Sequence, residues 1–217
     1  MLAYLVRHGQ SFNTHPSPGQ TDPVNPPLTP VGLAQAERVA LRLRPLGIDC
    51  VVSSPMIRAV ETARAIGAVV RRQVEIWPRC HEHRETPGYP CWGARELRLH
   101  YPDLVLPPDF AEDDWEYGNE PLEHVVQRAD EFLEWLASLA GQRAGLRMVV
   151  VSHGAFTRIV FGRAISAEPA AMERVVVDNT AVSTLEVAPG SLTVLGFNDT
   201  SHLAGIEGLD PVAGVTR

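Results

Sequence analysis

Four basic residues follow apolar segments of the chain, at positions where they could together bind a phosphate group. They are Arg7 and His8, Arg58, and His153. The apolar runs before them, residues 2–6, 51–52 and 148–151, have the composition of buried strands. Because the carboxyl ends of parallel strands line the ligand crevice of an open sheet, we expect these side chains to converge. Two arginines and two histidines there would bind a tetrahedral oxyanion and leave one histidine free to attack it, which implies phosphoryl transfer through a phosphohistidine.

The elements that must position these residues alternate between strand and helix along the chain, as in α/β proteins. Strands are predicted at 2–6, 51–53 and 148–151, with a hairpin formed by 182–187 and 192–197. Helices are predicted at 29–47, from 54 to about 67, at 122–139 and from about 155. Thr29 can cap the first helix, with Pro30 at its first position. We expect an α/β fold whose strand ends carry the basic residues.

Composition agrees with a single α/β domain. A chain of 217 residues can bury a substantial core. No apolar run approaches the ~20 residues of a membrane span, and the N-terminus has no pattern of a signal peptide. Three cysteines, an odd number, do not suggest a disulfide framework. These features predict a cytoplasmic protein with no membrane partner.

The charge pattern bears on the kind of ligand. The formal net charge of −7 argues against nucleic acid as the main partner. All 19 basic residues are arginine, so any cationic contact to phosphate must come from arginine or protonated histidine.

Four motifs occur in an order typical of one protein family. They are Arg7-His8-Gly9, Leu28-Thr29-Pro30-Val31-Gly32, Ser53-Ser54-Pro55 followed by Arg58, and Ser152-His153-Gly154. In this the chain resembles the histidine phosphatase superfamily, also called phosphoglycerate mutase-like, from residue 2 to about residue 203. The resemblance implies a three-layer α/β sandwich with a mostly parallel central sheet flanked by helices. It also implies a phosphatase that hydrolyses a small phosphomonoester, such as a sugar or glycerate phosphate, without a cofactor.

The roles of the basic residues follow from their chemistry and from this resemblance. The charges of Arg7 and Arg58 would lower the pKa of a neighbouring histidine and favour its neutral, nucleophilic form. Both arginines would bind the non-bridging phosphate oxygens, and His153 would donate to the same group. The residues alone do not decide which histidine attacks. The resemblance assigns attack to His8, with its other ring nitrogen held by a backbone carbonyl.

A general acid must protonate the leaving alcohol and then take a proton from water. The stretch from Val74 to Glu82 resembles the family segment that leads to this acid, with Pro78 four residues before Glu82. Cys80-His81 departs from the family pattern there, and Glu85 is the alternative acid. We expect Glu82 to be the acid.

Further substrate contacts are carried over from the family motifs. Gln10 and Ser11 match the opening motif, whereas Thr14 stands where family members often have asparagine, with Asn13 one position early. The backbone after Asn179, at Thr180, is expected to close the pocket. The irregular 80–121 segment is predicted to be a lid that decides substrate choice.

Three other functions fit the sequence less well than a phosphatase does. Four potential zinc ligands occur within twelve residues, namely Cys80, His81, His83 and Cys91, but their spacing does not follow the usual paired pattern. A mutase would need a longer basic and aromatic segment after the acid, and the chain has no lysine and an acidic lid. A non-catalytic interaction protein on the same fold is disfavoured because all four basic positions are present.

Overall fold

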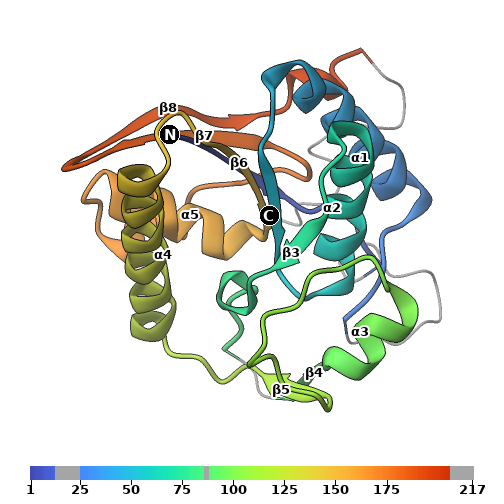
Figure 1. Ribbon diagram of the computed structural model, residues 1–217. Helices are drawn as coiled ribbons and strands as arrows, with labels where there is room; N and C mark the ends of the chain where they lie inside the picture. The colour runs from blue at the N-terminus through green and yellow to red at the C-terminus, as the bar shows by residue number, and fades with distance from the viewer. Residues whose placement is uncertain (13–24, 86–87, 206–217) are drawn as a thin grey trace.

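The computed structural model describes residues 1–12, 25–85 and 88–205. Its centre is a six-stranded sheet in the order β3-β2-β6-β1-β7-β8 (Figure 1). The strands are β1 (Leu2–Arg7), β2 (Cys50–Ser53), β3 (Val74–Ile76), β6 (Arg147–Ser152), β7 (Val182–Ala188) and β8 (Ser191–Asp199). β3, β2, β6 and β1 run parallel, whereas β7 pairs antiparallel with β1 and β8 antiparallel with β7. The predicted strands and the hairpin are confirmed.

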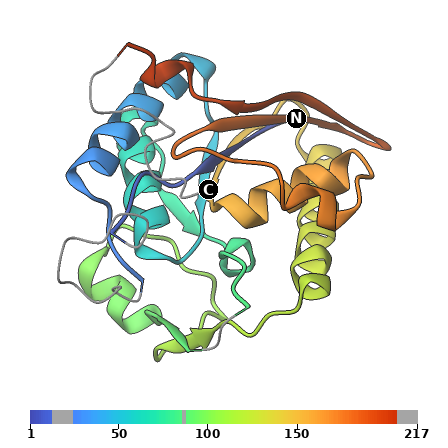
Figure 2. The same ribbon diagram turned by 180° about the vertical axis from the view of Figure 1, so that it is seen from behind.

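Helices cover both faces of the sheet, which gives three layers (Figures 1 and 2). On one face lie α1 (Pro30–Leu43) and α2 (Ile57–Val70). On the other lie α4 (Leu122–Gln142) and α5 (Gly154–Ala164). The predicted mostly parallel three-layer sandwich is therefore confirmed.

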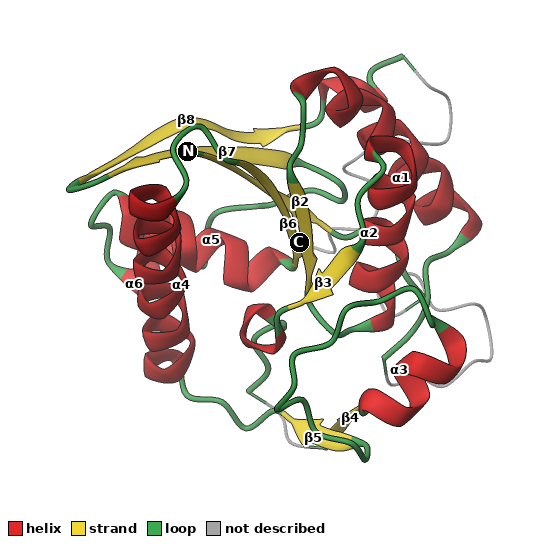
Figure 3. Ribbon diagram, in the orientation of Figure 1, coloured by secondary structure: helices red, strands yellow, loops and turns green. Residues whose placement is uncertain are grey.

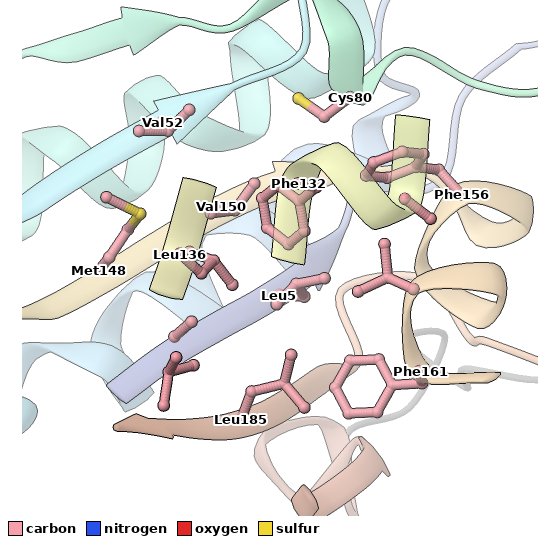
Figure 4. Close-up of a cluster of buried hydrophobic side chains, with 14 of the residues drawn as sticks. Leu5, Val52, Cys80, Phe132, Leu136, Met148, Val150, Phe156, Phe161 and Leu185 are labelled. Atoms are coloured by element: carbon pink, nitrogen blue, oxygen red, sulfur yellow. The ribbon is translucent and has the colours of Figure 1, made fainter. Parts of the chain in front are cut away.

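The central strands are apolar throughout because both of their faces are buried. Leu5 and Val150 point to one face and pack in a cluster with Phe132 of α4 and Phe156 of α5 (Figure 4). Their neighbours in sequence, among them Val6, point to the opposite face and pack against α1 and α2. The alternation of side chains along a strand sends successive residues to the two cores.

The first two helices begin for different reasons. The Thr29 hydroxyl accepts a hydrogen bond from the backbone N–H of Gly32 at 3.0 Å, and Pro30 opens the helix, as predicted. The prediction that α2 starts at Ser54 is wrong by three residues, since the helix begins at Ile57. The Ser54 N–H still donates to the carbonyl of Val151 in β6 at 3.0 Å, which keeps this backbone in the extended form of the sheet.

The 80–121 segment contains short elements that the sequence did not predict. A two-stranded antiparallel sheet joins β4 (Tyr89–Cys91) to β5 (Trp115–Tyr117), with α3 (Ala94–His100) between them. Figure 3 shows these elements together, below the edge of the main sheet. The remaining short elements are 3-10 helices η1 (Arg44–Leu46), η2 (Pro78–Cys80) and η3 (Ser201–Leu203), and helix α6 (Pro169–Met172). Within the described ranges, no helix combines the length and the apolar character that crossing a bilayer demands.

Candidate active site

The parallel strands bring the predicted basic residues to one edge of the sheet. In the register of β1 and β6, Arg7 lies opposite Ser152, so His8 and His153 leave the sheet side by side. Their ring centroids are 5.0 Å apart. β2 ends at the same edge, with Ser53 opposite Val151, and leads through Ser54 into α2 and Arg58.

His8 is held as a neutral imidazole with one nitrogen presented to Arg58. Its side chain is buried, and Nδ1 lies 2.7 Å from the carbonyl oxygen of Gly9. Since a carbonyl only accepts, Nδ1 carries the proton and donates, and the lone pair is on Nε2. Nε2 accepts a hydrogen bond from Nε of Arg58 at 3.1 Å. Burial is the largest cause that places the pKa of His8 well below 6.5, and the charges of Arg58 and Arg7 act in the same direction.

The backbone after His8 requires glycine because of a close approach between two segments. A Cβ on Gly9 would lie 2.6 Å from the carbonyl oxygen of Gly32, and a Cβ on Gly32 would lie 1.9 Å from the carbonyl oxygen of Gln10. The exit of β1 thus crosses the start of α1 with no room for side chains at either position. This contact fixes the carbonyl of Gly9 that orients His8.

The other basic residues present nitrogen atoms to the same edge. Arg58 is 2 % exposed, lies in the first turn of α2, and donates through Nη2 to Sδ of Met56 at 3.1 Å. Arg7 donates through Nη1 to the carbonyl of Val177 at 2.6 Å, and burial lowers its pKa. His153 is fully buried, and its Nε2 lies 2.8 Å from the Ser54 hydroxyl. Nε of Arg7 and Nδ1 of His153 have no hydrogen-bond partner among the described residues. Such nitrogens suit an anionic ligand.

Glu82 lies at the border of this cluster and Glu85 does not. The Glu82 carboxylate accepts hydrogen bonds from the first N–H groups of α5, those of Ala155 at 3.1 Å and Phe156 at 3.3 Å. Its charge also acts on Arg7. The side chain of Glu85 is exposed. Of the two alternatives, the structure brings only Glu82 to the start of the helix that follows His153.

The remaining predicted contact residues mainly support the backbone around His8. The Gln10 side-chain oxygen accepts from the Thr29 hydroxyl at 2.6 Å, and Ser11 is buried in an isolated bridge with Leu28. Thr180 donates its N–H to the carbonyl of Arg7 at 3.0 Å and its hydroxyl to that of Asn179 at 2.8 Å. Thr14 lies outside the described residues.

The cysteines and histidines of the alternative zinc site do not come together. Cys80 and Cys91 are both buried, but they belong to different hydrophobic clusters. Burial raises the pKa of each thiol to about 12. Nδ1 of His81 lies 2.9 Å from the carbonyl oxygen of Glu82. In the part of the chain that the structure describes, no group of three or more His, Cys, Asp or Glu side chains is placed to hold a metal ion.

Three side chains support the site in roles that were not predicted from the sequence. Asn179 donates through Nδ2 to the carbonyl of His8 at 3.0 Å. Glu120 and Arg128 form a buried ion pair beside the segment that carries Glu82. Arg128 could have been noticed, because it falls on the apolar stripe of α4, three residues after Val125.

Comparisons with known proteins agree with this geometry. The family described as "Histidine phosphatase superfamily (branch 1)" matches residues 3–200. A probable phosphoglycerate mutase of Yersinia enterocolitica is 28% identical over 94% of this chain and 95% of its own. An uncharacterized phosphatase of Bacillus subtilis is 24% identical over 93% of this chain and 96% of its own.

Solved structures share the fold. A phosphoserine phosphatase of Entamoeba histolytica, crystallised as a mutant with phosphoserine, superposes with a TM-score of 0.67 at 22% identity, over 93% of this chain and 98% of its own. The same protein with 3-phosphoglyceric acid gives a TM-score of 0.65 at 21% identity, again over 93% of this chain and 98% of its own. The family match over most of the length and the strand-end arginine and histidine cluster lead to one conclusion: the chain belongs to branch 1 of the histidine phosphatase superfamily.

Proposed function

We propose that the protein is a phosphatase that hydrolyses small phosphomonoesters through a phosphohistidine on His8. One observation carries this proposal. Nδ1 of His8 is tied to the Gly9 carbonyl, so the nucleophilic lone pair is fixed on Nε2, facing Arg58. A neutral, oriented imidazole beside two guanidinium groups is what phosphoryl transfer to nitrogen requires.

In the first half-reaction, Nε2 of His8 attacks phosphorus and the bond from phosphorus to the ester oxygen breaks. Arg7, Arg58 and His153 bind the non-bridging oxygens and stabilise the charge that spreads over them. Glu82 gives its proton to the leaving alcohol. The 80–121 segment supplies contacts to the rest of the substrate.

In the second half-reaction, water attacks the phosphohistidine and the bond from phosphorus to Nε2 breaks. Glu82 takes a proton from the attacking water, which restores its acid form, and the lone pair returns to His8. Inorganic phosphate leaves. No step needs a metal or an organic cofactor, because arginine and histidine supply the positive charge.

Two observations, the ligands of relatives and the charge of the 80–121 segment, support the proposed substrate class. The Entamoeba relative was crystallised with phosphoserine and with 3-phosphoglyceric acid, both small phosphorylated metabolites. The α3 arginines are already neutralised within the segment, since Arg98 pairs with Glu112 at 2.9 Å and Arg95 with Asp113 at 3.0 Å. This internal pairing leaves them poorly placed to hold a second phosphate, which favours a singly phosphorylated ester of the sugar or glycerate type.

Phosphoglycerate mutase activity is the second candidate, because the Yersinia relative bears that name. The two activities differ in their product from 3-phosphoglycerate. A phosphatase releases inorganic phosphate, whereas a mutase yields the isomer with the phosphate on the neighbouring oxygen. A panel of phosphorylated metabolites compared by kcat/KM, with both products measured, tests the proposal. Isomer formation much faster than phosphate release would show a mutase instead.

A further inference from the structure

Arg128 is a buried arginine whose guanidinium is fully engaged by segments on either side of Glu82. Only 7 % of the residue is exposed. Nε and Nη2 each donate to one oxygen of the Glu120 carboxylate at 2.7 Å, and Nη1 donates to the carbonyl oxygens of Arg79 at 2.6 Å and His81 at 3.1 Å. These contacts join α4 to the residues that directly precede Glu82.

The bond to His81 acts on the backbone of Glu82. The carbonyl of His81 and the N–H of Glu82 belong to one planar peptide unit, so the orientation of one sets that of the other. On the other side of Glu82, Nε2 of His83 lies 2.9 Å from the carbonyl oxygen of Glu120. The Glu120–Arg128 pair therefore restrains the chain both before and after Glu82.

The same guanidinium also contacts the helix start that binds the Glu82 carboxylate. The central carbon of the Arg128 guanidinium lies 5.1 Å from the ring centroid of Phe156, a cation–π distance. Phe156 packs in the core (Figure 4), and its backbone N–H donates to Glu82. One side chain thus holds both the backbone of Glu82 and the first turn of α5 against which its carboxylate rests.

The choice of arginine at this position is explained by geometry. The carboxylate of Glu120 takes two parallel bonds from one edge of the guanidinium while Nη1 reaches two carbonyls, an arrangement that needs a planar fork. A buried ion pair contributes little net stability compared with apolar residues of the same size. The pair between α4 and the loop at Glu120 is better explained by what it positions.

We propose that Arg128 is a positioning residue for Glu82, holding the acid in place through the His81 peptide and the start of α5. This inference rests on the proposed function, in which Glu82 protonates the leaving group. A loosened acid matters most for a poor leaving group, because an alkoxide must be protonated as it leaves whereas a nitrophenolate need not be. Loss of Arg128 should therefore change the rate in a way that depends on the leaving group.

The test compares Arg128→Lys with the parent protein on an alkyl phosphate and on p-nitrophenyl phosphate. Lysine keeps the charge but cannot make the planar contacts. We expect kcat/KM for the alkyl phosphate to fall by about 10- to 100-fold, as for a small misplacement of a catalytic group, and kcat/KM for p-nitrophenyl phosphate to fall by less than about 3-fold. In a Glu82→Gln background, Arg128→Lys should add no further leaving-group dependence, because the acid is already absent.

Arg163→Lys is the matched control. Arg163 of α5 also makes a two-bond pair with a carboxylate of α4, that of Asp130, at 2.7 and 3.1 Å. It is exposed, and these bonds do not involve the segment around Glu82. Both substrates should keep their rates in this variant. If Arg128→Lys does not fold, Glu120→Gln replaces it, since it weakens the same fork and should give the same selective loss to a smaller degree.

The outcomes separate the two proposals. Suppose that Glu82→Gln shows leaving-group dependence, but Arg128→Lys and Glu120→Gln lose activity equally on both substrates or lose none. The positioning role of Arg128 would then be overturned. Absence of that dependence in Glu82→Gln itself would overturn the assignment of the acid, and the role of Arg128 with it.

Discussion

Nε of Arg58 lies 3.1 Å from Nε2 of His8, the ring nitrogen whose lone pair would attack phosphorus. The donor holds the imidazole in the reactive orientation, and its positive charge contributes to keeping that imidazole neutral. Once a phosphoryl group is bonded to Nε2, the same guanidinium is within reach of the phosphoryl oxygens. Arg58 is thus suited to serve both the free and the phosphorylated forms of His8.

This relationship predicts a phosphoenzyme at a single residue. Mixing the protein rapidly with a labelled phosphomonoester should give a label that is lost in acid and stable in base, as expected for phosphohistidine. His8→Ala should abolish it, because the nucleophile is gone, whereas His153→Ala should reduce its rate of formation and leave its position unchanged. Mass spectrometry of the quenched protein locates the label. Label that persists in His8→Ala, or that maps to His153, contradicts the assignment.

The acid assignment predicts different behaviour for Glu82 and Glu85. General acid catalysis is commonly worth ~10²–10⁴ in rate, so Glu82→Gln should reduce kcat/KM for an alkyl phosphate by about that amount and affect p-nitrophenyl phosphate far less. Glu85→Gln, a change of an exposed side chain, is the control and should affect both substrates mildly and alike. If the leaving-group dependence appears only in Glu85→Gln, the acid lies three residues later than proposed.

The strand ends of this site could be predicted because their surroundings are simple. Residues 2–6 and 148–151 are apolar at every position because both faces of β1 and β6 are buried. In a chain whose strands and helices alternate, such runs indicate parallel strands. The start of α2 was misplaced because the Ser54 N–H remains bonded to Val151, a contact between segments far apart in sequence. Local preferences for a helix at Ser54-Pro55 do not contain that information.

The 80–121 segment could not be predicted for a related reason. β4 and β5 have three residues each, too few for a period to show, and β4 contains Pro90. Their pairing depends instead on contacts with the rest of the protein, such as the packing of Cys91 and Tyr117 against Met56. The role of Arg128 was hidden likewise, because besides Glu120 it binds the backbone carbonyls of Arg79 and His81, which carry no mark in the sequence.

Buried histidines predict a loss of stability in mild acid. The pKa values of His8 and His153 lie well below 6.5, chiefly through burial and then through the charge of Arg58. For His81 and His202, burial lowers the pKa to about 4. Above about pH 7.5, roughly one unit over the unfolded pKa of 6.5, these histidines are neutral in both states, so stability is full there. As the pH falls further, the unfolded chain takes up protons that the folded protein does not, and the free energy of unfolding decreases by up to about 1.4 kcal/mol per pH unit for each histidine.

Urea unfolding at pH 7, 6 and 5 measures this decrease. His153→Asn should make the free energy of unfolding depend less steeply on pH, since one of the contributing groups is removed. His124→Gln, which changes an exposed side chain, should leave it as it is. A free energy of unfolding that stays constant between pH 7 and pH 5 would contradict the buried, neutral state of these rings.

Metal independence is expected from the charge that arginine and histidine already provide. Dialysis against a chelator should leave kcat/KM unchanged and remove no stoichiometric zinc, as measured by elemental analysis. A double variant, Cys80→Ser with Cys91→Ser, separates packing from metal binding. It should lower stability and leave kcat/KM unchanged, because the buried thiols contribute to folding and not to the chemical step. Activity lost on chelation and restored only by Zn²⁺ would make the Cys80–Cys91 region a metal site.

The antiparallel pairing of β7 with β1 has a consequence for how the protein is made. The reversal returns Asn179 and Thr180 to the exit of β1, where Asn179 binds the carbonyl of His8 and Thr180 binds that of Arg7. Asn179 and His8 are 171 positions apart in the sequence. On the ribosome, the first residues of the reactive centre emerge early and the groups that hold them emerge late. The nascent chain therefore holds Arg7 and His8 without these partners until β7 has been made and adds to the sheet.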